Sequence, residues 1–238
     1  MNITLNINGL NVLAQYSDDE IENVHQPLLR RFTQLHTLMP NRRTIIFLSA
    51  PPGTGKSTLT TFWEYLACQD PHLVQIQTLP MDGFHRYNHW LEEHGLRGSK
   101  GAPETFDIAK LADNLRQIRQ GEGTWPQYDR QKHDPVENAI NVSAPVVIVE
   151  GNWLLLDDEQ WRVLAEFCDF SLFIKAPASA LRERLVRRKL AGGLSQVEAE
   201  AFYERTDGPN VRRVLENSRA ANLTLEMAIE GTYQLACP

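Results

Sequence analysis

The sequence predicts an α/β fold, in which helices cover both faces of a mostly parallel β-sheet and a β-hairpin with a helix precedes it. Three observations support this prediction. Apolar runs of strand length alternate with amphipathic helical stretches from residue 43 onward, a glycine-rich turn joins the first run to a helix, and 238 residues suffice for one sizeable domain with an appendage. We expect the extension at residues 1–40 and the main domain at residues 41–238.

The extension is expected to form a hairpin followed by a helix. Residues 3–16 alternate apolar and polar side chains around Asn8-Gly9, a dipeptide that favours a tight turn. Ser17 and Glu20 fit a capping box, and apolar residues then recur at helical spacing up to Pro40. Apolar stripes of this kind are more often structural than functional, so we interpret the extension as a flap packed on the main domain.

The main domain is expected to contain five sheet strands with helices between them. The apolar runs that predict the strands are 44–49, 74–81, 145–150, 170–175 and 222–227. The amphipathic stretches that predict helices are 57–69, 107–120, 178–190 and 195–204. Segment 83–106 predicts a long loop or a small helical insertion. In such sheets ligands bind beyond the carboxyl ends of the strands, so the residues at those ends matter most.

The composition is that of an ordinary enzyme, with 42% hydrophobic residues and a net charge of −6. An acidic chain has no general attraction for DNA or anionic lipid, which argues against nucleic-acid and membrane partners. The sequence shows no secretory leader and no apolar segment long enough to span a bilayer, so we expect a cytoplasmic protein. Its three cysteines, Cys68, Cys168 and Cys237, lack the spacing of a disulfide framework or a zinc site.

The stretch APPGTGKS at residues 50–57 matches the phosphate-binding pattern G-x-x-x-x-G-K-[ST], except that Ala50 replaces the first glycine. Glycines let backbone N–H groups point at a phosphate, Lys56 supplies charge for the β- and γ-phosphates, and the Ser57 hydroxyl can ligate Mg²⁺. The motif lies between a predicted strand and a predicted helix, which disfavours a chance match. We expect ATP or GTP to bind here, at Pro52, Gly53, Thr54, Gly55, Lys56, Ser57 and Thr58.

Two carboxylates end predicted strands. Glu150 closes the run PVVIVE and would face the Mg²⁺ side of the phosphate loop if its strand lies beside TIIFLS; the alternative is a carboxylate that ends a strand in solvent. Asp82 ends the run before DGFHRYNHW and could accept the proton of an attacking hydroxyl; the alternative is a turn cap before Gly83.

Several segments together resemble the kinase family that contains bacterial pantothenate kinase, uridine kinase and phosphoribulokinase. They are APPGTGKST (50–58), MDGFH (81–85), KGAPETFD (100–107), PQYDRQKHDP (126–135) and IVEGNWLL (148–155). The similarity looks greatest to bacterial proteins labelled fructose-transport-system kinases or nucleoside kinase-like proteins. The resemblance implies the three-layer fold of P-loop kinases and a magnesium-dependent phosphate transfer from ATP to a small-molecule hydroxyl.

The resemblance also implies residue roles. Lys56 and Ser57 would handle phosphate and metal, Asp82 would act as general base, and Glu150 would help to hold Mg²⁺. The residues expected to line the acceptor site are Phe84, His85, Tyr128 and His133; read from the residues alone, His133 could equally lie in a solvated polar loop. Uridine kinases tend to carry two adjacent acids where this chain has Asp82-Gly83, so the pattern is nearer that of pantothenate kinase.

The segment LRERLVRRKLAGG at residues 181–193 places Arg184 and Arg188 one helical turn apart, with Arg187 close by. Such a cluster could close over the phosphates as a lid and neutralise the charge of the transferring group; the alternative is a solvated basic helix face. Residues 205–210 predict a break in helical structure at Gly208-Pro209 and a loop near the nucleotide base, and residues 224–236 predict a strand pair.

The leading hypothesis is therefore an ATP-dependent kinase whose acceptor is pantothenate-, nucleoside- or sugar-like. The competing hypothesis is an accessory or switch NTPase that changes shape for a protein partner. The Asn-Lys-x-Asp element that reads guanine is absent, and the segment AGGLSQ does not complete the Leu-Ser-Gly-Gly-Gln signature of transporter ATPases.

Overall fold

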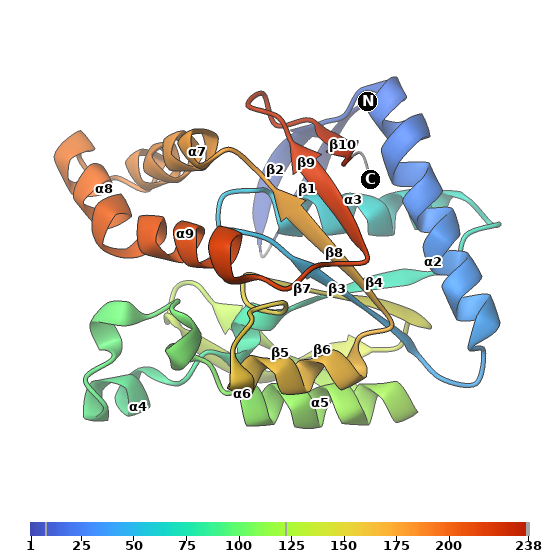
Figure 1. Cartoon of the computed structure of the whole chain (residues 1–238), viewed down its shortest axis with the longest axis horizontal. Coiled ribbons are helices and arrows are strands. Elements are labelled where there is room, and N and C mark those ends of the chain that lie inside the picture. The colour runs from blue at the N-terminus through green and yellow to red at the C-terminus, as the bar shows by residue number, and fades with distance from the viewer. Residues whose placement is uncertain (8, 122, 237–238) are drawn as a thin grey trace.

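A computed structural model describes residues 1–7, 9–121 and 123–236 (Figure 1). Asn8 of the predicted turn and Cys237 lie outside the described residues. The central sheet has the strand order β10-β9-β8-β3-β7-β4. Its strands are β3 (Thr44–Ser49), β4 (Ile76–Pro80), β7 (Val146–Gly151), β8 (Phe170–Lys175), β9 (Leu223–Met227) and β10 (Tyr233–Leu235). All neighbours pair in parallel except β9 and β10, which confirms the predicted mostly parallel sheet.

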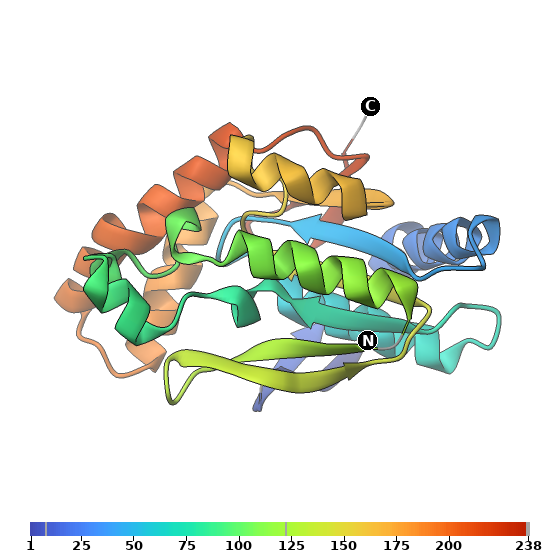
Figure 2. The ribbon, with the colours of Figure 1, turned by 90° about the horizontal axis from the view of Figure 1, so that it is seen from below.

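Apolar side chains on the two faces of this sheet form two separate cores. On one face they pack against the N-terminal extension, α3 (Lys56–Gln69) and α7 (Ala178–Ala191). On the other face they pack against α5 (Ile108–Gln120) and α6 (Glu159–Arg162), which lie side by side in Figure 2. The strand β3 is buried along its whole length, as expected of a central parallel strand covered on both faces.

The N-terminal extension, residues 1–40, forms the expected hairpin and helix. Strand β1 (Asn2–Ile7) pairs with β2 (Leu10–Gln15), and α1 (Asp18–Glu20), a π turn (Ile21–His25) and α2 (Gln26–Leu38) follow. Ser17 caps the helix by accepting from the Glu20 N–H at 3.0 Å. The reciprocal half of the predicted capping box does not form, because the Glu20 carboxylate instead accepts from the Tyr233 N–H at 2.9 Å. The Glu20 side chain, which the local pattern assigned to the helix cap, thus binds the backbone of the distant strand β10.

The insertion between β4 and β7 carries most of the unexpected structure. It begins with a 3₁₀ turn (Met81–Phe84) and continues through α4 (Asn88–Glu93), two short 3₁₀ turns and α5, as the helical-insertion prediction allowed. It ends in a second hairpin, β5 (Gly123–Asp129) with β6 (Asp134–Val142), which the sequence did not predict. This hairpin is called the insertion hairpin below, and Figure 2 shows it at the edge of the molecule.

The predicted break at residues 205–210 is wrong. The chain continues helically through α8 (Gln196–Phe202), a π turn (Tyr203–Asp207) and α9 (Gly208–Asn217). Gly208 has right-handed helical geometry with φ −61°, its N–H donates to the Tyr203 carbonyl in the π turn, and Pro209 follows in the first turn of α9. The predicted strand pair at 224–236 is present as β9 and β10. None of the helices in the described ranges is long and apolar enough for a bilayer-spanning segment.

Candidate active site

The phosphate loop joins β3 to α3. Gly53 and Gly55 have φ values of 90° and 83°, a left-handed geometry that favours glycine, and Gly55 immediately precedes the first helical residue. Ala50 is fully buried in the core, and its N–H donates to the Gly151 carbonyl at 3.1 Å. The Cβ of Ala50 therefore packs in the apolar core. This packing explains why alanine is accepted where the usual pattern has glycine.

Two side chains of the loop form hydrogen bonds with residues at the carboxyl end of β7, the strand beside β3. The Ser57 hydroxyl donates to Glu150 Oε1 at 2.7 Å. Lys56 Nζ donates to Asn152 Oδ1, also at 2.7 Å. The parallel register, in which Leu48 lies opposite Glu150, brings these residues to the carboxyl edge of both strands. Asn152 is a site residue that the sequence analysis missed, although it directly follows the Glu150-Gly151 pair.

Burial shifts the pKa values of both Glu150 and Lys56. Burial raises the pKa of the Glu150 carboxyl above its usual range, and the nearby Lys56 ammonium opposes that rise. Burial likewise lowers the pKa of Lys56, while Glu150 and Asp82 act in the opposite direction. A buried carboxylate beside a hydroxyl oxygen fits Mg²⁺, which takes one or two protein oxygens and completes its shell with water and phosphate. Within the described residues no cluster of three or more His, Cys, Asp or Glu side chains offers an all-protein metal site.

Asp82 lies in the 3₁₀ turn that directly follows β4, the next strand along the sheet. Since Pro80 pairs with Glu150 in the parallel register, Asp82 emerges at the same carboxyl edge. Its charge raises the pKa of Lys56, after the larger opposite effect of burial and the contribution of Glu150, so the two side chains lie within electrostatic range. Lys56, Asp82 and Glu150 therefore emerge at the same edge of the sheet, and the roles expected of them stay predictions.

Gly83 allows the insertion hairpin to approach the Asp82 turn. A Cβ built on Gly83 would lie 2.1 Å from the carbonyl oxygen of Pro126 in β5. No larger residue fits without moving one of the two backbones. The glycine that separates this sequence from the two-acid pattern therefore has a packing role.

The four predicted acceptor-site residues divide into two pairs. The ring of His85 lies 4.9 Å from the Tyr128 ring between centroids, with the planes tilted by 48°, and its Nδ1 lies 2.8 Å from the Asp82 carbonyl oxygen. Burial raises the pKa of Tyr128 to about 12, with Asp82 adding to the rise. Phe84, in contrast, is 1% exposed and packs in the core, whereas His133 is exposed at the turn of the insertion hairpin with φ 55°. The structure thus brings His85 and Tyr128, but not the other two, beside Asp82.

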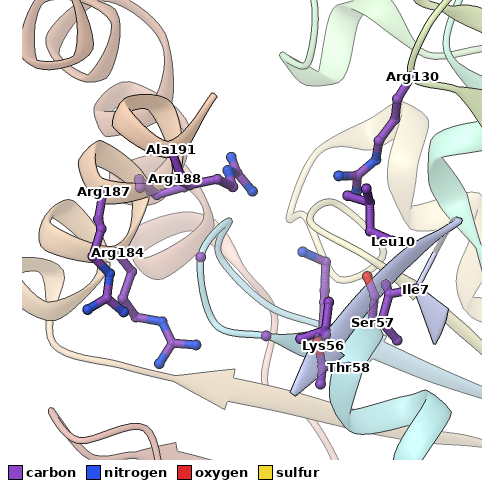
Figure 3. Close-up of a pocket in the computed structure, with 14 residues that line it drawn as sticks. Ile7, Leu10, Lys56, Ser57, Thr58, Arg130, Arg184, Arg187, Arg188 and Ala191 are labelled. Carbon is purple, nitrogen blue, oxygen red and sulfur yellow. The ribbon is translucent and has the colours of Figure 1, made fainter. Parts of the chain in front are cut away.

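A cavity of about 470 Å³ opens over the phosphate loop (Figure 3). Arg184, Arg187 and Arg188 of α7 line one side, Lys56 projects from the floor, and Arg130 reaches in from the insertion hairpin on the opposite side. The described residues provide no ion-pair partner within 4.0 Å for any of these four arginines. The predicted pair Arg184 and Arg188 is thus in place, and sequence reasoning missed Arg130.

The N-terminal extension also contributes to this cavity. Ile7, Leu10 and Val12 of the first hairpin line it, and the same hairpin borders a second cavity of about 270 Å³ beside Ser57 and Glu150. The extension was interpreted as a structural flap. Its alternating apolar pattern signalled a hairpin but carried no information about which side chains would face a distant loop.

Tyr233 of β10 forms a hydrogen bond with the backbone of the phosphate loop. Its buried hydroxyl donates to the Thr54 carbonyl oxygen at 2.5 Å, and its N–H donates to Glu20 of the extension. Behind Glu20, the fully buried His25 accepts from Trp63 Nε1 of α3 at 3.1 Å. Tyr233 therefore links the N-terminal extension to the phosphate loop through hydrogen bonds. No sequence motif marked Tyr233 for this position.

Comparison with known proteins identifies the family, although no family model matches the chain. It is 70% identical to the uncharacterized protein YggC of Escherichia coli, over 98% of both chains. It is 32% identical to a "putative uridine kinase" of Schizosaccharomyces pombe, over 71% of this chain and 76% of that protein. A pantothenate kinase of Enterococcus faecalis is 29% identical over 65% of this chain, which spans about half (52%) of that enzyme.

A solved structure agrees with these relatives. The crystal structure of a "putative fructose transport system kinase" from Silicibacter sp. TM1040 superposes with a TM-score of 0.73 at 33% identity, covering 81% of this chain and 97% of that one. The resemblance inferred from the motifs is confirmed. The chain therefore belongs to the family of P-loop kinases that includes uridine kinase and pantothenate kinase, and is accordingly an ATP-dependent phosphotransferase.

Proposed function

We propose that this kinase transfers the γ-phosphate of ATP to a hydroxyl group of a pantothenate-, nucleoside- or sugar-like small molecule, with Mg²⁺ as cofactor. The observation that supports this most strongly is the 2.7 Å contact of the Ser57 hydroxyl with Glu150, beside a buried Lys56 and within reach of the Asp82 charge. A phosphate loop, a metal-binding pair and a candidate base on adjacent strand ends are the parts that phosphoryl transfer to an alcohol requires.

The nucleotide phosphates would lie over the loop, where backbone N–H groups and the start of α3 favour negative charge. The proposed nucleotide residues are Gly53, Gly55, Lys56, Ser57 and Thr58, all of which line the cavity; Pro52 and Thr54 are buried and shape the loop from behind. Ser57 and Glu150 would hold Mg²⁺, which when bound neutralises charge on the β- and γ-phosphates.

In the proposed reaction the acceptor oxygen attacks the γ-phosphorus as the bond from that phosphorus to the β,γ-bridging oxygen of ATP breaks, leaving ADP. Asp82 takes the proton that the acceptor hydroxyl loses, so the products are a phosphate ester, ADP and a protonated carboxyl. Arg184 and Arg188 would neutralise charge on the transferring group. Residues 181–193, most of which belong to α7, would form the lid that closes over the phosphates. Lys56 would remain with the phosphates throughout.

The acceptor would bind beside the Asp82 turn, at the end of the insertion hairpin that carries Tyr128. His85 and Tyr128 border this place and offer one aromatic face each, together with a ring nitrogen and a hydroxyl for hydrogen bonds. Phe84 would support His85 from the core, and His133 would contribute only if the hairpin turn moved inward. The names of the relatives point to three acceptor types, namely pantothenate, uridine and a sugar.

A panel experiment tests the proposal. The protein is incubated with Mg-ATP and, one at a time, pantothenate, nucleosides, sugars and sugar phosphates, and ADP release is followed. Release that requires one acceptor and disappears in Asp82→Asn supports the kinase. Release that is indifferent to every acceptor supports the alternative, an accessory NTPase in which Asp82 only caps its turn.

A further inference from the structure

The cavity over the phosphate loop holds more positive charge than the nucleotide alone explains. Five cationic side chains line it, namely Lys56, the three arginines of α7 and Arg130. Lys56 faces Glu150 and Asp82, whereas the described residues place no carboxylate within 4.0 Å of the arginines. Bound Mg²⁺ already neutralises part of the charge on ATP. The remaining positive charge is available for a second anion in the same cavity.

Arg130 stands apart from the other arginines by its position. The three arginines of α7 lie on the lid side, whereas Arg130 extends from the insertion hairpin on the opposite side of the cavity (Figure 3). It is two residues from Tyr128, and its charge lowers the pKa of Tyr128, although burial and Asp82 have the larger, opposite effects. Arg130 therefore belongs to the wall that carries the acceptor-side residues.

Hydrogen bonds hold the turn that carries Arg130 in place. The Asp129 carboxylate, next to Arg130 in the sequence, takes part in these bonds. Asp129 accepts from the N–H groups of Gln131 and Lys132 at 2.8 and 3.0 Å, and its other oxygen lies 3.9 Å from Lys132 Nζ. Lys100 also anchors the turn through the His133 carbonyl. The Asp129 carboxylate is thus committed to the turn, which leaves the adjacent guanidinium free to bind a ligand.

We propose, resting on the proposed kinase function, that the acceptor carries an anionic group, a carboxylate or a phosphate, in addition to the hydroxyl that is phosphorylated, and that Arg130 binds this anion. A guanidinium can donate two parallel hydrogen bonds to either group, which fixes orientation as well as affinity. The anion held at Arg130 would aim the acceptor hydroxyl across the cavity, toward Asp82 and the γ-phosphate. The acceptor class is therefore a hydroxy acid or a sugar phosphate rather than a neutral nucleoside or free sugar.

Matched acceptor pairs test this in steady-state kinetics. The pairs are pantothenate with panthenol, fructose 6-phosphate with fructose, and uridine 5′-phosphate with uridine; the first separates a carboxylate from the two phosphates. We expect turnover only with an anionic member. Arg130→Gln should raise the KM of that acceptor about tenfold or more, the usual loss for a charged hydrogen bond, and the KM of ATP less than about threefold. Lys132→Gln, a cation on the same turn but outside the cavity, is the matched control and should change neither.

Two results would overturn the inference while leaving the kinase intact: equal use of a neutral partner, or an Arg130→Gln effect confined to ATP. Absence of acceptor-dependent ADP release with every compound would instead count against the proposed function. The inference then rests on binding: protein saturated with Mg²⁺ and a non-hydrolysable ATP analogue is titrated with inorganic phosphate in a calorimeter. Binding that Arg130→Gln abolishes and Lys132→Gln retains supports the inference. No binding, or equal binding in both variants, refutes it.

Discussion

Gly83→Ala isolates the contribution of the insertion hairpin to catalysis. Gly83 has no left-handed geometry, so alanine meets no backbone strain there; the new Cβ instead meets the backbone of the hairpin, with the Pro126 carbonyl oxygen nearest at 2.1 Å. Ordinary van der Waals contact begins near 3.4 Å, so the hairpin or the Asp82 turn must move by about 1 Å or more. A misplacement of that size costs about 10²-fold in rate when it separates a base from its substrate. The phosphate loop lies on other strands, and nucleotide affinity should change far less.

The assay measures kcat for acceptor-dependent ADP release, with the affinity for a fluorescent ATP analogue measured separately. Gly98→Ala is the matched control, because no atom lies within 4 Å of the Cβ that it adds and its backbone is likewise not left-handed. Circular dichroism and the melting temperature show whether each variant folds. A folded Gly83→Ala protein with a normal kcat would show that the approach of the hairpin to the Asp82 turn does not position the acceptor.

Three further predictions concern the loop and its partners. Lys56→Ala should weaken binding of a fluorescent ATP analogue by tenfold or more, about 1.4 kcal/mol, whereas Asp82→Asn should leave it largely intact and remove turnover; equal losses of affinity would contradict the proposed division of roles. Because the pKa of Glu150 is raised, protons compete with Mg²⁺ there, so stabilisation by Mg-ATP in a thermal shift assay should grow as the pH rises through and above the usual carboxyl range. Glu150→Gln should remove both the stabilisation and its pH dependence. Tyr233→Phe removes a buried hydrogen bond to the phosphate loop, so it should lower the free energy of unfolding by about 1–3 kcal/mol and raise the KM of ATP. The control is Tyr65→Phe, which removes the hydroxyl of a tyrosine with no such bond to the loop and should change neither quantity.

Prediction from sequence succeeded where structure follows from neighbouring residues. The strand TIIFLS runs over the predicted residues, and the glycines of the phosphate loop adopt the left-handed geometry that their identity suggested. The metal role of Glu150 was conditional on the run PVVIVE lying beside this strand; the two do pair in parallel, and the register brings Glu150 to Ser57. Local periodicity and backbone sterics are sufficient for such features, because each depends on a few consecutive side chains.

Prediction failed at two segments that contain proline. Pro126, Pro135 and a bulge between Trp125 and Gln127 obscure the alternation that would have revealed the insertion hairpin. The expected loop at Gly208-Pro209 is helical: the π turn Tyr203–Asp207 leads directly into α9, and the Gly208 N–H donates to the Tyr203 carbonyl. The Gly-Pro pair by itself indicates a helix break.

The sequence by itself determined the alternation of sheet strands with helices, the phosphate loop and the acidic strand ends, since these depend on spacing along the chain. Only the tertiary structure decided that Arg130 faces the arginines of α7, that Asn152 meets Lys56, and that Tyr233 holds the phosphate loop. The physical reason is that the sheet order and its register bring together segments as distant in sequence as Thr54 and Tyr233. No local pattern specifies which side chains then share a cavity.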